Sequence, residues 1–240
     1  MSALPGLSLF HTANGEDFLK ILNDGEIKPS LCTVFDGEFL SYFFVGRPAY
    51  KTEVVCDPSY WQLPAVFVFD ELSDYSPKRM YPFDTGAYSG DKFRKIIGRI
   101  DLAEFEILPD RSNISCLIRT FFGSDLKYVE GHPRSYDSIK ELVGHSVSNF
   151  VPMALSKLYN FPFNEMIDDR SRLIELQFDS AIALKRPILK GIVCCKEWLR
   201  DPSVKAKIDR FECDIKVFGI LPLSTSSYYS KIYELASEIK

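Results

Sequence analysis

The chain has 240 residues, of which 46% are hydrophobic and 26% are charged, a composition that excludes long disordered stretches and suits a globular protein with an aromatic-rich core. Its 33 acidic and 29 basic residues give a net charge of −4, so the whole molecule does not attract phosphate backbones and any nucleic-acid contact requires a local basic patch. No window approaches the roughly 18 apolar residues of a spanning helix, and the N-terminus lacks a secretory pattern. We therefore expect a soluble, cytoplasmic protein with no membrane partner.

The first structural unit of the chain is predicted by local signals alone. The segment LSLFHT has the pattern of a short strand, and GEDFLKILND follows it with Phe18, Leu19 and Leu22 on one helical face. Asn14 is suited to cap the start of this helix, and Gly25 to end it in the left-handed conformation. The sequence therefore predicts a strand, a capped helix and a turn, in this order.

Strands are expected again on both sides of a less informative middle. A second strand lies in EFLSYFFVGRPAY and a third in AVFVFDEL, whereas SPKRMYPFDTGAYSGDKF has the composition of a loop. Residues 92–148 are expected to be mainly helical. After them, RSRLIELQFD and CDIKVFGIL predict strands, ILKGIVCCKEWL predicts a strand leading into a helix, and SSYYSKIYELASEIK predicts an amphipathic helix. The fold class is therefore α+β, in one domain of residues 1–240 with a mainly helical insertion at about 75–165.

The cysteines and the common catalytic motifs exclude several kinds of chemistry. The six cysteines form no C-x-x-C pair and lie in apolar stretches, which favours reduced, buried thiols over zinc or disulfides, and no metal is expected. The chain has no G-x-S-x-G, no Walker loop and no H-E-x-x-H. The cysteines are Cys32, Cys56, Cys116, Cys194, Cys195 and Cys213.

Polar residues interrupt three of the predicted strands and are the candidates for a site. His11 and Thr12 end the first strand, where an imidazole and a hydroxyl can face a ligand; the alternative is a core histidine bonded to backbone. Arg47 ends the second strand with a planar cation that suits a phosphate or carboxylate, and Gly46 leaves room for a ligand. A structural, salt-bridged arginine is equally consistent with the sequence.

Glu175 is the third candidate, in the strand that follows Arg170. If this segment is a strand, Glu175 lies on one face with Gln177 and Asp179, while Ile174 and other apolar residues form the opposite face. The same alternation fits an edge strand with one solvent-exposed face. The pattern therefore supports either a functional carboxylate or a wet strand surface.

The order of these pieces resembles the ADP-ribosyltransferase superfamily, most closely the DarT-type toxins that modify nucleic acids. The resemblance is carried by LFHT, by the helix ending LNDGEIKPS, by YFFVGRPAY and by the late LIELQF, and it leaves residues 75–165 unmatched. It implies an ADP-ribosyltransferase-like split β-sheet core with inserted helices. It also implies NAD as co-substrate, bound by His11 and Thr12 at the ribose or carboxamide, with Tyr42 or Phe44 stacking on the nicotinamide.

The same resemblance implies a role for each of the charged candidate residues. Arg47, next to Gly46, would be the catalytic or pyrophosphate-contacting arginine, and Glu175 would bond the 2′-hydroxyl of the nicotinamide ribose and accept a proton from the nucleophile. A carboxylate beside the sugar stabilises the positive charge that develops as the nicotinamide leaves. The segment NFPFNEMIDDRSR would be the acceptor-recognition loop, or else a solvated turn.

The expected function is therefore transfer of ADP-ribose from NAD to a macromolecule, as a toxin or antiviral effector. DNA or RNA is the preferred acceptor, and the acidic net charge keeps a protein acceptor open. The alternatives are an NAD glycohydrolase, which transfers ADP-ribose to water, and a non-catalytic nucleotide-binding module. The sequence leaves open whether an antitoxin partner exists.

Overall fold

The computed structural model describes residues 6–49, 58–70, 72–144, 146, 148–162, 169–220 and 225–239, without the side chains of 225–227. Over these residues the chain forms two compact units. The first, here called the helical unit, comprises Met1–Leu7, Leu31–Glu38 and Pro77–Gln177. The second, the sheet unit, comprises Ser8–Ser30, Phe39–Ser76 and Phe178–Lys240. Strands and helices are mixed in the chain, so the α+β class is confirmed.

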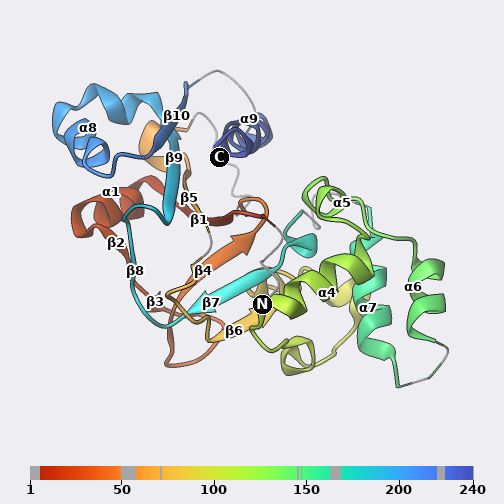
Figure 1. Cartoon of the computed structure of the whole chain (residues 1–240). Coiled ribbons are helices and arrows are strands. Elements are labelled where there is room, and N and C mark those ends of the chain that lie inside the picture. Colours follow the sequence, from red (N-terminus) through yellow and green to blue (C-terminus); the bar gives the residue numbers. More distant parts are fainter. Residues whose placement is uncertain are drawn as a thin grey trace. The chain divides into compact units, whose positions relative to one another are not determined.

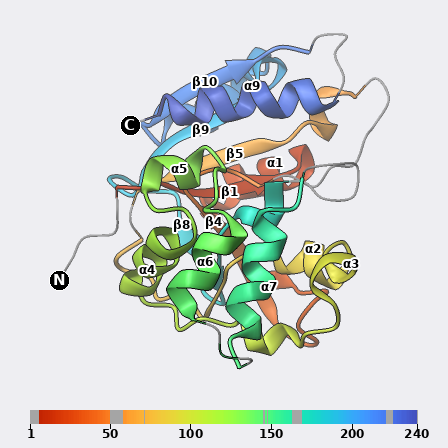
Figure 2. The ribbon, with the colours of Figure 1, turned by 90° about the vertical axis from the view of Figure 1, so that its right-hand side faces the viewer.

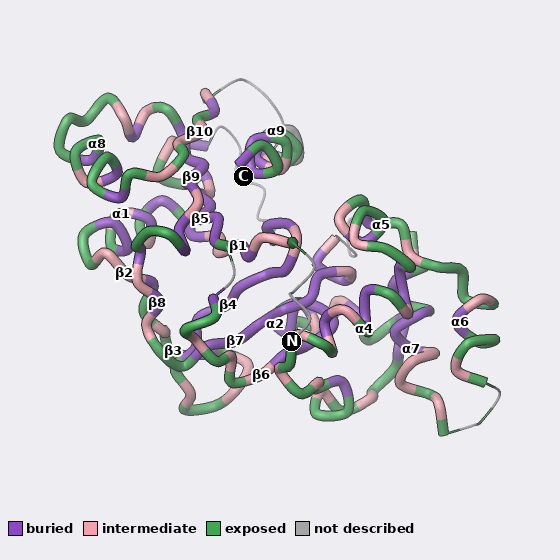
Figure 3. Tube along the Cα trace, viewed as in Figure 1, coloured by how far each residue is buried: buried purple, intermediate pink, exposed green. Residues whose placement is uncertain are grey.

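A twisted run of five neighbouring strands forms the centre of the sheet unit (Figure 1). Their order is β10-β9-β5-β1-β4, with β9 and β10 parallel and the other neighbours antiparallel. Strands β5 and β9 are buried along almost their whole length, as Figure 3 shows. The strands are β1 (Leu9–Ala13), β4 (Phe39–Val45), β5 (Ala65–Phe69), β9 (Leu189–Cys195) and β10 (Asp214–Phe218), and β2 (Glu26–Ile27) pairs separately with β8 (Ile182–Ala183).

Helix α1 (Gly15–Asp24) has the start and the end that the sequence predicts. The Asn14 side chain accepts a hydrogen bond from the Asp17 amide at 2.8 Å, and Gly25 ends the helix at φ 72° with its N–H donated to the Ile21 carbonyl. Its buried face carries Phe18, Ile21 and Leu22, whereas the predicted Leu19 is only half-buried. The Phe18 ring packs against Phe67 of β5 with centroids 5.7 Å apart.

Two helices therefore cover opposite faces of the central strands. Residues paired across antiparallel strands point to the same face, and β1 pairs Phe10 with Val68, which in turn pairs with Gly191 of β9. A Cβ at Gly191 would lie 2.8 Å from Ile239, just after α9 (Thr225–Ser237), so Phe10 lies on the α9 face. The neighbouring residue His11 lies on the α1 face. The remaining helical elements of the sheet unit are α8 (Pro202–Asp209) and 3₁₀ helices at Tyr60–Gln62 and Lys196–Arg200.

The helical unit contains most of the helices, seen face-on in Figure 2. They are α2 (Thr85–Ser89), α3 (Arg94–Ile97), α4 (Arg111–Phe121), α5 (Asp125–Val129), α6 (Tyr136–Val143) and α7 (Phe150–Tyr159), with 3₁₀ helices at Leu102–Phe105 and Asp169–Arg172. Strand β6 (Arg79–Tyr81) pairs antiparallel with β7 (Glu175–Phe178), whose last residue falls in the sheet unit. The short strand β3 (Ser30–Leu31) completes the elements.

The prediction of a loop over SPKRMYPFDTGAYSGDKF is wrong, because this segment contains β6 and α2. Strand β6 is stabilised by its ladder to β7, a partner almost a hundred residues away, which local composition does not reveal. The expected burial of the cysteines is correct for Cys32, Cys194 and Cys195, whereas Cys213 is half-buried and Cys116 is exposed. Cys56 lies outside the described residues. Among the residues described, no helix is both long and apolar enough to cross a bilayer.

Candidate functional site

Glu175 is a buried carboxyl group held by three hydrogen bonds. Thr85 donates to it twice, from its hydroxyl to Oε1 at 2.8 Å and from its backbone N–H to Oε2 at 3.1 Å. Gln177, two residues along β7, donates from Nε2 to Oε1 at 2.7 Å and also to the Thr85 hydroxyl at 3.2 Å. The side chains of Glu175, Gln177 and Thr85 thus form one closed polar cluster, all three at most 1% exposed.

The pKa of Glu175 is raised to about 8. Burial is the largest cause, because it removes the water that stabilises the charged carboxylate, and the nearby Asp84 adds repulsion. The hydrogen bonds from Gln177 and Thr85 act in the opposite direction and lower the pKa, but they do not cancel the burial. With this pKa, the neutral, protonated form of the carboxyl group prevails at pH 7.

Helix α2 brings Thr85 to this carboxyl group. Asp84 caps the helix by accepting from the Ala87 amide at 2.7 Å, which directs the first helical N–H, that of Thr85, toward Glu175. Arg170 approaches Asp84 at 3.9 Å and is itself buried. A buried acid, a helix start and a cation are thus packed behind Glu175.

The burial of β7 settles one alternative for this strand. Glu175, Leu176, Gln177 and Phe178 are all buried, so an edge strand with one solvent-exposed face is wrong for these residues. Only Asp179, just past the strand, is exposed. A polar pair that is kept buried needs internal partners, and Thr85 supplies them for Glu175 and for Nε2 of Gln177, whereas Oε1 of Gln177 has no hydrogen-bond partner among the described residues.

His11 is hydrogen-bonded to the backbone, which agrees with the alternative of a core histidine. Its Nδ1 lies 2.9 Å from the Tyr42 carbonyl oxygen, which can only accept, so Nδ1 carries the proton. Burial lowers the pKa of His11, although the bond to Tyr42 and the charge of Asp17 act against it. The imidazole is therefore neutral, with Nε2 as an acceptor; its ring lies 5.2 Å from Phe43 and 6.4 Å from Phe67 on the α1 face.

Thr12 does not share this face with His11, since successive side chains of a strand alternate. It lies on the α9 face with Val66, its partner in β5. Phe44 pairs with Phe10 and lies on the same face, and Tyr42 precedes it by two residues. The Thr12 hydroxyl is buried and has no hydrogen-bond partner among the described residues. The expected pair therefore divides between the two faces of β1.

Gly46 and Arg47 follow directly on β4. Gly46 has φ 78°, and its N–H donates to the Ser8 carbonyl at 2.8 Å, so the glycine is required by the backbone turn and not only by the space it leaves. Arg47 behind it is 9% exposed, a low value for a permanent cation. Its partners therefore matter for stability whether or not it binds a ligand.

The structure groups the candidates in two sets. His11, Thr12, Tyr42, Phe44, Gly46 and Arg47 belong to the sheet unit, whereas Glu175 belongs to the helical unit. Residues 163–168 of the expected acceptor loop lie outside the described residues. Thr85 was not predicted: Asp84 before a short helical pattern signals a helix start, but nothing local signals its contact with a residue 90 positions away.

Comparisons with known proteins add no further assignment: no protein-family model matches the sequence, and no curated protein or solved structure matches it.

Proposed function

We propose that the protein is an NAD-dependent ADP-ribosyltransferase that transfers ADP-ribose to a base of DNA or RNA, as a toxin or antiviral effector. The observation that carries the proposal is the Glu175 carboxyl group, which is buried, held by Thr85 and Gln177, and has a pKa raised to about 8. Such a group, at the position that the resemblance gives to the superfamily glutamate, is suited to accept a proton in its ionised form, which prevails above a pH of about 8. The superfamily's split-sheet core is part of the same proposal.

The chemistry assigns one bond broken and one bond formed. The nicotinamide–ribose bond breaks and its electrons leave with nicotinamide, while the sugar carbon becomes positively charged and is stabilised by Glu175 in its ionised form. A nitrogen or oxygen of the acceptor base then bonds to that carbon and gives its proton to Glu175. Positioned proton transfer of this kind contributes about 10²–10⁴-fold to a rate.

The residues of the sheet unit are proposed to bind NAD. Arg47, a buried cation at the end of β4, would hold the pyrophosphate, and Tyr42 or Phe44 would stack on the nicotinamide. Nε2 of neutral His11 would accept a hydrogen bond from a ribose hydroxyl. Because Thr12, Tyr42 and Phe44 lie on the α9 face and His11 lies on the α1 face, these contacts are alternatives. NAD on the α9 face would contact Thr12 and Tyr42 or Phe44, and NAD on the α1 face would place its ribose at His11.

The experiment is incubation with NAD labelled in its ADP-ribose part, together with separate pools of DNA, RNA and protein. We expect label in one nucleic-acid pool, release of nicotinamide, and loss of both in Glu175→Gln, which keeps the size of the side chain. Asp179→Asn, an exposed change on the same segment, is the matched control and should leave labelling intact.

Three results would contradict this proposal and favour one of the alternative functions. Labelled protein alone would make the enzyme protein-directed, and nicotinamide release without any labelled pool would make it an NAD glycohydrolase. NAD binding without release would indicate a non-catalytic nucleotide-binding module. If Glu175→Gln labels as well as the wild type, Glu175 has no catalytic role.

A further inference from the structure

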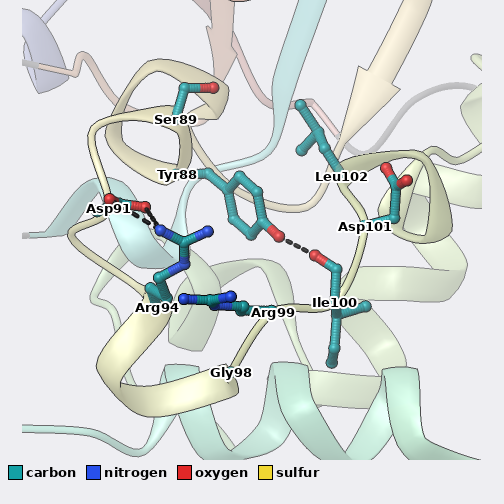
Figure 4. A pocket seen from close by; sticks show the side chains of 9 residues that line it. All are labelled: Tyr88, Ser89, Asp91, Arg94, Gly98, Arg99, Ile100, Asp101 and Leu102. Atoms are coloured by element: carbon teal, nitrogen blue, oxygen red, sulfur yellow. Dashed lines mark hydrogen bonds and ion pairs between the residues drawn. The ribbon is translucent and has the colours of Figure 1, made fainter.

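A pocket away from Glu175 lies in the helical unit, around the turn from α2 to α3 (Figure 4). It has a volume of about 440 Å³, within the range of pockets that hold small ligands. Its walls come from the end of α2, from α3 and from the segment before the next 3₁₀ helix. The lining residues that matter here are Tyr88, Asp91, Arg94, Gly98 and Arg99.

Two arginines and two aspartates line the pocket, and among the described residues one arginine–aspartate ion pair joins them. Arg94 forms an ion pair with Asp91 at 2.9 Å. Arg99 has no ion pair within the described part of the chain, and Figure 4 shows its side chain reaching into the same corner as that of Arg94. Arg94 and Arg99 together offer a site for an anion, because each guanidinium group presents a planar fork of N–H donors and, among the residues that the structure describes, Asp91 pairs only with Arg94.

The surrounding sequence strengthens this charge. Residues 91–101, DKFRKIIGRID, hold four basic and two acidic residues in a chain whose net charge is −4. Asp101 caps the start of the next 3₁₀ helix, where its side chain accepts a hydrogen bond from the Ala103 amide at 3.0 Å. This segment is therefore a local basic patch of the kind that an acidic protein needs to contact phosphate.

An aromatic ring is fixed beside the two arginines. Tyr88 stacks on Phe83 with centroids 5.4 Å apart and an interplanar angle of 10°, and it meets Phe105 edge-on. Its hydroxyl donates to the Ile100 carbonyl, as the dashed line in Figure 4 shows. The ring is only half-buried, so part of its surface remains available to a ligand base.

The backbone of the pocket is also unusual. Asp91 has φ 60°, and Gly98 has φ 74° with ψ −156°, a region that only glycine adopts readily. A Cβ at Gly98 would meet no atom within 4 Å, so the glycine serves the backbone conformation from which Arg99 departs, not a tight contact. Conformations of this kind persist where the surrounding structure fixes them, often at ligand sites.

We propose that this pocket binds a nucleotide unit, with its phosphate between Arg94 and Arg99 and its base against Tyr88. The nucleotide is either free or one unit of a single strand; both present the same phosphate and ring. The proposal needs no NAD and no turnover, so it stands or falls separately from the transferase activity.

The test uses the full chain carrying Glu175→Gln, without NAD, and a fluorescent single-stranded oligonucleotide of mixed sequence titrated at several salt concentrations. Arg99→Gln removes the unpaired charge and should weaken binding about threefold to tenfold at low salt. It should also lower the slope of log K against log salt by about 0.7, the value for one phosphate contact to a single strand. Arg119→Gln, an exposed arginine on α4, is the matched control with the same change in charge.

Calorimetry with AMP distinguishes a free nucleotide from one unit of a single strand. Binding of the oligonucleotide or of AMP that depends on Arg99 and not on Arg119 supports the pocket, and which of the two binds identifies the source. If neither ligand binds, or if the Arg99 and Arg119 variants lose affinity equally, the proposal is wrong.

Discussion

At the scale of single residues, Glu175 shows how burial and hydrogen bonding compete. Burial and Asp84 favour the neutral acid, while Thr85 and Gln177 donate to the charged form, and the raised pKa shows that burial prevails. A carboxyl group in this balance costs folding free energy whenever it is ionised. That cost has a measurable pH dependence.

We predict that the stability of the wild-type protein falls as pH rises from about 5 to 8, more than that of Glu175→Gln. Between the ordinary pKa of 4.5 and the folded value of about 8, the folded state binds more protons than the unfolded state, so raising the pH favours unfolding. Over this pH range, the loss of unfolding free energy should be larger in the wild type than in Glu175→Gln by at least about 1 kcal/mol. This is less than the roughly 1.4 kcal/mol that corresponds to one pKa unit. Urea unfolding at several pH values measures it; Glu104→Gln, on an exposed 3₁₀ helix, should retain the wild-type slope.

A second prediction concerns His11. Since its Nδ1–H donates to the Tyr42 carbonyl and burial lowers its pKa, the imidazole should be neutral at pH 7 and should titrate below 6.5. Nitrogen NMR of the labelled imidazole distinguishes the two tautomers directly. A spectrum with the proton on Nε2, or a pKa above 6.5, would contradict the role of Nε2 as an acceptor for a ribose hydroxyl.

At the scale of elements, the sequence predicts helix ends well where the capping hydrogen bonds join residues that are close in the sequence. Helix α1 was predictable because Asn14 and Gly25 form their capping bonds within a few residues of the helix they bound. Strand β6 was not, since its bonds go to β7, and neither was the contact of Thr85 with Glu175. The face of Thr12 was predictable in principle from strand alternation, but the burial of both faces of β7 was not, because it depends on tertiary packing.

The turn at the end of β4 carries the third prediction. Gly46→Ala should destabilise the protein by about 1–2 kcal/mol, because φ 78° places a Cβ against the backbone. Gly46→Asn should cost less, since asparagine tolerates the left-handed region better than alanine. Thermal or urea unfolding measures both variants. If alanine and asparagine cost the same, the backbone conformation is not what requires this glycine.

At the scale of the whole molecule, the two charged residues named in the proposed function belong to different units. Arg47 ends a strand of the sheet unit, and Glu175 begins a strand of the helical unit. Local patterns identified each residue type at a strand end, but spatial proximity of residues so far apart in sequence is a tertiary property. Kinetics can test whether the two residues act on one substrate.

The last prediction is that Arg47→Ala and Glu175→Gln are not additive in kcat/KM for nicotinamide release. If Arg47 holds the pyrophosphate so that the ribose lies against Glu175, a substrate misplaced by Arg47→Ala gains little from the carboxylate, and the double variant loses less than the product of the two single losses. Pairing Glu175→Gln with Arg119→Gln provides the reference, because two residues that share no substrate should combine independently. Losses that multiply for Arg47 as they do for Arg119 would place Arg47 and Glu175 in separate functions, and Arg47 would then be a structural cation of the sheet unit.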